Sequence, residues 1–250
     1  MTDATVETHQ IESESSAKPN ENKQPKGAAF FDVDHTLIDC STEMHLAVAV
    51  FRQTTMPKLN ALVRLAKVVT AILLYKLNIS KDLIDLKKKS YRAILGGCTE
   101  KELQECFEQI FRDDLIHRFF PESLELLKSH QDQGHKVVLV SGSMQIIIDF
   151  IGKYLNVDRC YSTRLVMDDN GVCTGEIDGL VVMSTNKSAF LKDYVDEYNL
   201  PLENCFAYGD HWDDRHMLGL TGHPIAVNPD NRLEKFAQKN NWEIKQYKSS

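Results

Sequence analysis

The stretch Phe30-Phe31-Asp32-Val33-Asp34-His35-Thr36-Leu37 determines how the rest of the sequence is interpreted. The apolar run over residues 28–31 predicts a short buried strand. That strand ends at Asp32, and Asp34 follows on the turn, so both carboxylates are expected to overlook one crevice. Two neighbouring buried carboxylates are costly to ionise unless a cation lies between them or they share a proton. The stretch therefore predicts a metal ion, acid-base chemistry or both, and a plain turn or helix cap is the alternative.

The composition is that of an ordinary globular protein. The 250 residues are 42% hydrophobic and 26% charged, with a formal net charge of −7, which suits one core domain with an insertion or a small second domain. The six cysteines form no CxxC pair and have no metal-ligand spacing, so reduced, buried thiols are expected. Residues 1–26 are polar and lack the apolar segment of a signal peptide, so they predict a disordered tail and a cytoplasmic protein.

Positive charge is concentrated in one part of the chain. Residues 41–98 hold ten Lys or Arg and three Asp or Glu, a net of +7, so the remainder carries −14. The segment also contains an apolar helical pattern over residues 59–77, which Arg64 and Lys67 interrupt, so it falls short of the roughly 20 apolar residues of a membrane span. Thr99 and Glu102 have the spacing of a capping box at the start of another helix. We therefore expect an inserted helical unit over residues 40–120.

From residue 121 onward, predicted strands and helices alternate. The pattern predicts a helix ending at Gly134, a hairpin turn at residues 169–171, and helices over residues 144–154 and 187–198. Strands are predicted over residues 137–140, 161–167 and 205–208, with a last strand over residues 225–227. This alternation predicts an α/β fold in which helices cover both faces of a parallel sheet. Residues 27–39 and 121–250 are expected to form that core.

Three further loops carry polar groups where such sheets bind ligands, at the carboxyl ends of the strands. Ser141-Gly142-Ser143 lies between a predicted strand and a helix, and either cradles phosphate with backbone N–H groups or caps the helix. Lys187 opposes the dipole of the helix that it opens, so it is either solvated or the cation that balances a bound phosphate. Asp210 and Asp214 either complete a Mg²⁺ site with Asp32 or form an ordinary acidic turn.

In this order, the four loops resemble the motifs of the haloacid dehalogenase (HAD) superfamily of phosphohydrolases. The resemblance is closest to subfamily IB, whose members are similar to phosphoserine phosphatases. The matching stretches are FFDVDHTL, VVLVSGS, MDDNGVCTGEIDG, AYGDHWDD and GHPIAVNPDNRLEKFA, from residue 28 to about residue 244. The resemblance implies a Rossmann-like three-layer core with a central parallel sheet and an inserted α-helical cap of the C1 type over residues 40–120.

The resemblance also implies a role for each core residue. Asp32 would attack phosphorus and form an aspartyl phosphate, while Asp34 would act first as acid and then as base. The phosphoryl oxygens would be held by Ser141, Gly142 and Lys187. Mg²⁺ would be the cofactor. Its protein ligands would be Asp32, the backbone carbonyl of Asp34, Asp210 and, directly or through water, Asp214.

The cap is expected to select the organic part of the substrate. In phosphoserine phosphatases a cap glutamate binds the substrate amine, but Ser41 stands at that position here and Glu43 is the nearest acid. Arg92 resembles the cap arginine that pairs with the substrate carboxylate, with a solvated helix arginine as the alternative. A phosphoserine-like metabolite is thus one expected substrate. A lipid-derived or amphipathic phosphate, bound through the basic apolar cap, is an alternative, although burial of the apolar faces within the cap is favoured over membrane contact.

The leading interpretation is a Mg²⁺-dependent phosphomonoester hydrolase that acts on a small phosphorylated metabolite. A dehalogenase would not need the acid at Asp34, and nothing in the sequence favours a phosphomutase. A non-catalytic phosphate-binding or regulatory module is the alternative from another class, and it predicts a missing member of the residue set, whereas every member is present. No nucleic-acid partner is expected, and the sequence makes no prediction of the oligomeric state.

Overall fold

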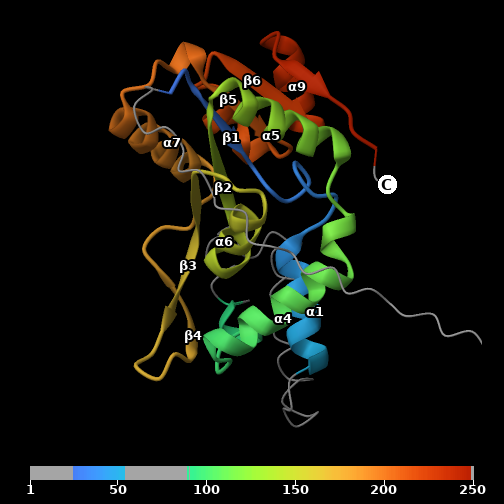
Figure 1. Cartoon of the computed structure of the whole chain (residues 1–250), viewed down its shortest axis with the longest axis vertical. Helices are drawn as coiled ribbons and strands as arrows, with labels where there is room; N and C mark the ends of the chain where they lie inside the picture. Colours follow the sequence, from blue (N-terminus) through green and yellow to red (C-terminus); the bar gives the residue numbers. More distant parts are fainter. Residues whose placement is uncertain (1–24, 54–88, 90, 249–250) are drawn as a thin grey trace, which may run out of the picture.

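The computed structural model describes residues 25–53, 89 and 91–248, and its centre is a seven-stranded sheet with the order β4-β3-β2-β1-β5-β6-β7 (Figure 1). The strands are β1 (Ala28–Phe31), β2 (Lys136–Met144), β3 (Arg159–Met167), β4 (Cys173–Asp178), β5 (Phe206–Gly209), β6 (His223–Val227) and β7 (Glu243–Lys245). Neighbouring strands are parallel except for the antiparallel pair β3 and β4. The first strand, β1, lies in the middle between β2 and β5.

Helices cover both faces of this sheet. The α-helices are α1 (Thr42–Gln53), α4 (Glu100–Asp113), α5 (Pro121–Gln133), α6 (Gln145–Tyr154), α7 (Thr185–Tyr198), α8 (Arg215–Leu218) and α9 (Asn231–Lys239). Three short 3₁₀ helices are η1 (Leu115–His117), η2 (Leu202–Asn204) and η3 (Trp212–Asp214). Because side chains alternate along a strand, Phe31 of β1 packs in the cluster that contains α5 and α6, and Phe30 packs in the cluster that contains α7, α8 and α9. The predicted three-layer α/β fold is confirmed.

Two of the predicted boundaries match local backbone geometry. Helix α5 ends at Gly134, which has a φ of 81° and donates its N–H to Gln131 and His130. The hairpin between β3 and β4 turns at Gly171, with a φ of 71°, and the Asp168 side chain accepts hydrogen bonds from the N–H groups of Asn170 and Val172. Both turns therefore occur where glycine permits a left-handed backbone.

Two predictions about the strands are wrong. Strand β2 does not end before Ser141-Gly142-Ser143 but continues to Met144, which still pairs with Thr163 of β3 after a shift in register, and the helix begins only at Gln145. Residues 225–227 are not the last strand, because β7 pairs with β6 beyond them. The pattern of β7 was missed because three residues, two of them charged, give too short an alternation to recognise.

Helices α1 and α4 lie at one end of the sheet, beside the β3–β4 hairpin (Figure 1). The predicted capping box of α4 is present, since Thr99 and Glu102 bond to each other's backbone N–H groups. Gly97 and Glu100 donate their N–H groups to Cys173 and Gly171, so this segment is joined to the hairpin. Predictions for residues 1–24 and 54–88 lie outside the described residues, and the division into core and cap stays a prediction. Among the described helices, none is long and apolar enough to span a membrane.

Candidate active site

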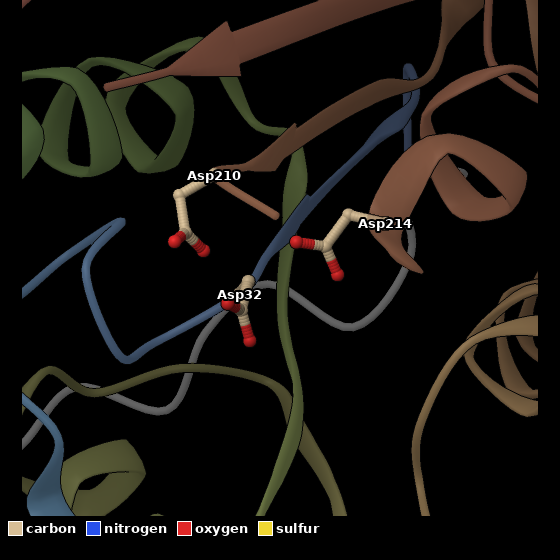
Figure 2. Close-up of side chains that lie close together, drawn as sticks. All are labelled: Asp32, Asp210 and Asp214. Carbon is tan, nitrogen blue, oxygen red and sulfur yellow. The ribbon is translucent and has the colours of Figure 1, made fainter. Parts of the chain in front are cut away.

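Three aspartates converge where β1 and β5 end (Figure 2). Asp32 follows β1 directly and donates its N–H to Tyr208 of β5 at 3.0 Å, so the pairing of the two strands fixes its position. Asp210 follows β5, and Asp214 ends η3. Carboxylate oxygens of the three lie within 4.8 Å of one another. A Cβ on Gly209 would lie 2.7 Å from the Cβ of Asp214, so glycine at this position allows the loop to bring Asp214 back to the strand.

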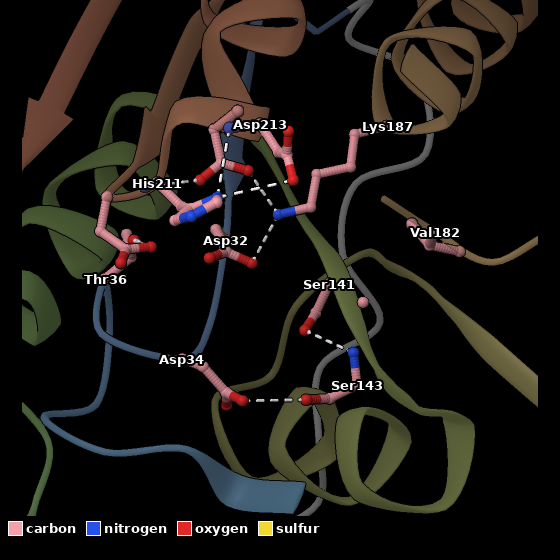
Figure 3. Close-up of polar contacts among 12 residues, drawn as sticks. Asp32, Asp34, Thr36, Ser141, Ser143, Val182, Lys187, His211 and Asp213 are labelled. Carbon is pink, nitrogen blue, oxygen red and sulfur yellow. Dashed lines mark hydrogen bonds and ion pairs between the residues drawn. The ribbon is translucent and has the colours of Figure 1, made fainter. Parts of the chain in front are cut away.

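Lys187 is the cation among these carboxylates (Figure 3). It lies in the first turn of α7 and is only 5% exposed, so it is not a solvated lysine. Its Nζ donates to Oδ1 of Asp32 at 2.8 Å and to Oδ1 of Asp214 at 2.6 Å. The helix dipole opposes a cation at this position, and the two carboxylates supply the attraction that holds it there.

The electrostatics leave negative charge without a counterion. Burial raises the pKa of Asp32 to about 6, with Lys187 opposing the rise. Burial, then Asp32 and Asp214, raise the pKa of Asp210 to about 9. Burial alone would lower the pKa of Lys187, but Asp214 and Asp32 outweigh it and raise that pKa above its usual value. Three carboxylates share one lysine, and oxygen ligands of this kind suit a hard divalent cation, so the residues present fit the predicted Mg²⁺.

Asp34 lies in a different environment from Asp32. Its Oδ1 accepts a hydrogen bond from Oγ1 of Thr42 at 2.7 Å, and its Oδ2 accepts one from Oγ of Ser143 at 3.0 Å. Burial raises its pKa, the charge of Glu43 adds to the rise, and the two hydroxyls oppose it. Sequence reasoning missed both hydroxyl partners. Ser143 belonged to a recognised loop, whereas only proximity to Asp34 along the chain pointed to Thr42.

The Ser141-Gly142 pair lies beside Asp34, but its backbone differs from the predicted helix cap. Oγ of Ser141 accepts the N–H of Ser143 at 3.1 Å, so one of the N–H groups expected to face phosphate already has a partner. The carbonyl of Gly142 accepts a hydrogen bond from Thr163 at 2.9 Å. A phosphate-binding role for Ser141 and Gly142 stays a prediction that this geometry neither requires nor opposes.

These groups surround one pocket of about 210 Å³. Its lining includes every predicted core residue and one of the two predicted cap residues: Asp32, Asp34, His35, Glu43, Ser141, Gly142, Ser143, Met183, Ser184, Lys187, Asp210, His211, Asp213 and Asp214. Glu43 accepts a hydrogen bond from the hydroxyl of buried Tyr91. Arg92 is not part of this lining. Its side chain is 66% exposed and forms an ion pair with Glu176 of β4.

Comparison with known families agrees with this arrangement. The sequence profile of the haloacid dehalogenase-like hydrolases matches residues 29–219, which is more than half of the chain. The chain belongs to the haloacid dehalogenase-like hydrolases.

Several relatives of this HAD hydrolase are phosphatases. It is 29% identical over 221 residues to a phosphoserine phosphatase of Mycobacterium tuberculosis, covering 88% of this chain and 71% of that protein. It is 27% identical over 168 residues to a histidinol-phosphatase of Neisseria meningitidis, covering 66% of this chain and 76% of that protein. The fold is shared with a substrate-bound phosphoserine phosphatase, with a TM-score of 0.66 and 20% identity over 91% of this chain and 96% of that one. The enzyme is thus a phosphoserine-phosphatase-like HAD hydrolase.

Proposed function

We propose that this hydrolase is a Mg²⁺-dependent phosphomonoesterase that works through an aspartyl phosphate on Asp32. The observation that carries the proposal is the pairing of Asp32 with Lys187 at 2.8 Å, in a pocket that two further carboxylates share. A carboxylate that attacks a phosphate dianion is repelled unless cations offset both charges. Lys187 supplies one such cation. Asp32, Asp210, Asp214 and the backbone carbonyl of Asp34 would hold Mg²⁺, which when bound would supply the remaining neutralisation.

The residues of the chain then act in two steps. A carboxylate oxygen of Asp32 forms a bond to phosphorus while the bond from phosphorus to the ester oxygen breaks, and that oxygen takes the proton of Asp34. In the second step Asp34, now ionised, takes a proton from a water molecule whose oxygen attacks phosphorus. The bond from Asp32 to phosphorus breaks, and inorganic phosphate leaves. A raised pKa at Asp34 favours this role, because the group must hold a proton before the first step.

The substrate is proposed to be a small aminoalkyl phosphate. Phosphoserine and histidinol phosphate, which the names of two relatives indicate as their substrates, both carry an amine on the carbon next to the phosphorylated CH₂ group. The carboxylate of Glu43 lines the pocket and would attract such an ammonium group. Arg92, with its ion pair to Glu176, offers no comparable support for a substrate carboxylate.

The alternatives have less support. Use of a lipid-derived phosphate depends on the apolar segment over residues 59–77, outside the described part of the chain. A non-catalytic phosphate-binding module would retain Lys187 but would not need Asp34 in the same pocket. The cytoplasmic location stays a prediction, and contact of the cap with a membrane surface stays the less favoured alternative.

The experiment that tests the proposal is a phosphate-release assay with Mg²⁺ over phosphoserine, histidinol phosphate, glycerol phosphate and micellar phosphatidic acid. The wild type is compared with Asp32→Asn and with Asp193→Asn, an exposed aspartate of α7 that serves as the matched control. We expect Asp32→Asn to lose about 10⁴-fold or more in kcat, the scale of loss when a nucleophile is removed. Wild-type turnover in that variant would show that Asp32 is not the nucleophile. Release from none of the esters would favour the non-catalytic module.

A further inference from the structure

Thr42 is a fully buried hydroxyl that takes no part in the proposed chemistry itself. It is the first residue of α1, it is 0% exposed, and it is absent from the lining of the pocket among the described residues. Its Oγ1 lies 2.7 Å from Oδ1 of Asp34 and 3.3 Å from Oγ of Ser143. A hydroxyl has one proton, so the shorter contact to the carboxylate takes it. The hydroxyl of Thr42 therefore acts on the carboxyl group of Asp34.

The second oxygen of Asp34 is held in the same way from another element. Oγ of Ser143, near the end of β2, donates to Oδ2 at 3.0 Å. Thr42 and Ser143 are 101 residues apart in the sequence, so the fold brings one donor to each oxygen of a single carboxyl group. Rotation of that group about either side-chain bond would break both hydrogen bonds. Asp34 is consequently fixed in direction as well as in place.

The direction in which Asp34 is fixed fits a proton donor. Its carboxyl group points toward Ser143 and away from Asp32 (Figure 3). When Asp32 attacks phosphorus in line, the leaving oxygen lies on the opposite side of phosphorus from Asp32. An acid that turned back toward Asp32 could not reach that oxygen. Each carboxyl oxygen also keeps another lone-pair position, so Asp34 can carry and release its proton without losing either hydroxyl.

We propose that Thr42 and Ser143 are positioning residues that hold the carboxyl group of Asp34 toward the leaving oxygen of the substrate. The proposal rests on the proposed function. For kcat/KM, which reports the steps up to departure of the leaving oxygen, it predicts that the hydroxyls matter only when that oxygen needs a proton. Nitrophenolate leaves without one, whereas an alkoxide does not, so esters of these two classes separate positioning of the acid from a general effect on structure.

The test measures kcat/KM for p-nitrophenyl phosphate and for the alkyl phosphate that the wild type hydrolyses fastest. The variants are Thr42→Val, which removes the hydroxyl at nearly constant shape, Thr42→Ser, which restores it, and Ser143→Ala. Thr221→Val is the matched control, because Thr221 is buried and its hydroxyl donates to the carbonyl of Leu218 in its own loop. Thermal unfolding of each variant reports folding separately.

We expect Thr42→Val to lose about 10²-fold on the alkyl ester, the scale for a misplaced catalytic group, and about threefold or less on p-nitrophenyl phosphate. Thr42→Ser should recover most of the loss, Ser143→Ala should resemble Thr42→Val, and Thr221→Val should change neither ester. Equal losses on both esters, or none on the alkyl ester, would overturn the proposal. If Asp34→Asn loses much more kcat/KM on the alkyl ester than on p-nitrophenyl phosphate and Thr42→Val does not, only the positioning role fails. If Asp34→Asn lacks that dependence as well, the proposed function fails with it.

Discussion

Asp32 and Asp34 are two residues apart, yet they lie in two different kinds of environment. Asp32 is surrounded by charge, with Lys187 and two further carboxylates close by. Asp34 is held by two neutral hydroxyls, one from α1 and one from β2. Charges mainly change the ionisation of a carboxyl group, whereas a pair of hydroxyls mainly fixes its direction. The same side chain is thereby adapted to bond formation at one position and to proton transfer at the other.

The largest effect should follow from removing the positive charge of Lys187 beside Asp32. Lys187→Met leaves the buried carboxylates of Asp32 and Asp214 without their partner. We expect kcat/KM to fall by about 10³–10⁵, the range for loss of a cation from a transferring phosphoryl group. The metal-free protein should also lose about 3–5 kcal/mol in free energy of unfolding, as when one partner of a buried ion pair is removed. Steady-state kinetics and urea unfolding measure the two effects.

The matched control for this prediction is Lys192→Met, since Lys192 is an exposed lysine five residues further along the same helix. It should change neither quantity appreciably, because surface lysines contribute little. A kcat/KM within tenfold of wild type in Lys187→Met would show that Asp32 does not need the positive charge of Lys187, and the contrast with Asp34 would lose its functional meaning.

A smaller effect should appear in the pH dependence of stability. In the metal-free protein burial raises the pKa of Asp32 to about 6 and that of Asp210 to about 9, from an ordinary value of 3.8. Between these limits the folded state keeps protons that the unfolded state has released, so the contribution of these two carboxyl groups to the free energy of unfolding falls as pH rises from about 4 to 9. Mg²⁺ favours the ionised carboxylates, so it should flatten this slope and, at 100 times its Kd, raise stability by about 2.7 kcal/mol.

Urea unfolding at several pH values, with EDTA and with Mg²⁺, measures this slope. Asp210→Asn should remove most of it and most of the stabilisation by Mg²⁺, whereas Asp196→Asn, at an exposed position on α7, should leave both unchanged. An identical slope with and without Mg²⁺ would show that the carboxylates do not bind the ion.

The charged surroundings of Asp32 were largely predictable from the sequence. Asp32 and Asp210 each follow a buried strand, and the carboxyl ends of parallel strands meet at one edge of a sheet, so their convergence follows from topology alone. The position of Lys187 at the start of a helix left a solvated lysine and a phosphate-balancing cation as alternatives, and the resemblance to the HAD superfamily favoured the second. The C-terminal end of α5 and the β3–β4 turn were also predictable, since a glycine marks each of them.

The two hydroxyl partners of Asp34 were not predictable in the same way. A threonine at the start of a helix already has an ordinary explanation as a helix-terminal residue, so its proximity to Asp34 along the chain was too weak a signal to predict that the two side chains bond. Its contact with Ser143 joins residues 101 positions apart, which only the assembled fold reveals. The partner of Arg92 was unpredictable for the same reason, because Glu176 reaches it from a hairpin whose length and direction are set by packing.

The smallest effect concerns the turn that follows Asp34. His35 directly follows Asp34, and its backbone has a φ of 62°. A β-branched residue in this left-handed conformation costs roughly 1–2 kcal/mol, whereas asparagine tolerates it. We therefore expect His35→Val to lower the free energy of unfolding by about that amount and His35→Asn to leave it nearly unchanged, as measured by urea unfolding. Arg164→Val is the control, because Arg164 is exposed in strand β3, where a β-branched residue fits. If His35→Val is as stable as the control, the turn does not impose its geometry on the chain. The direction of the Asp34 carboxyl group would then depend on its hydrogen bonds to Thr42 and Ser143.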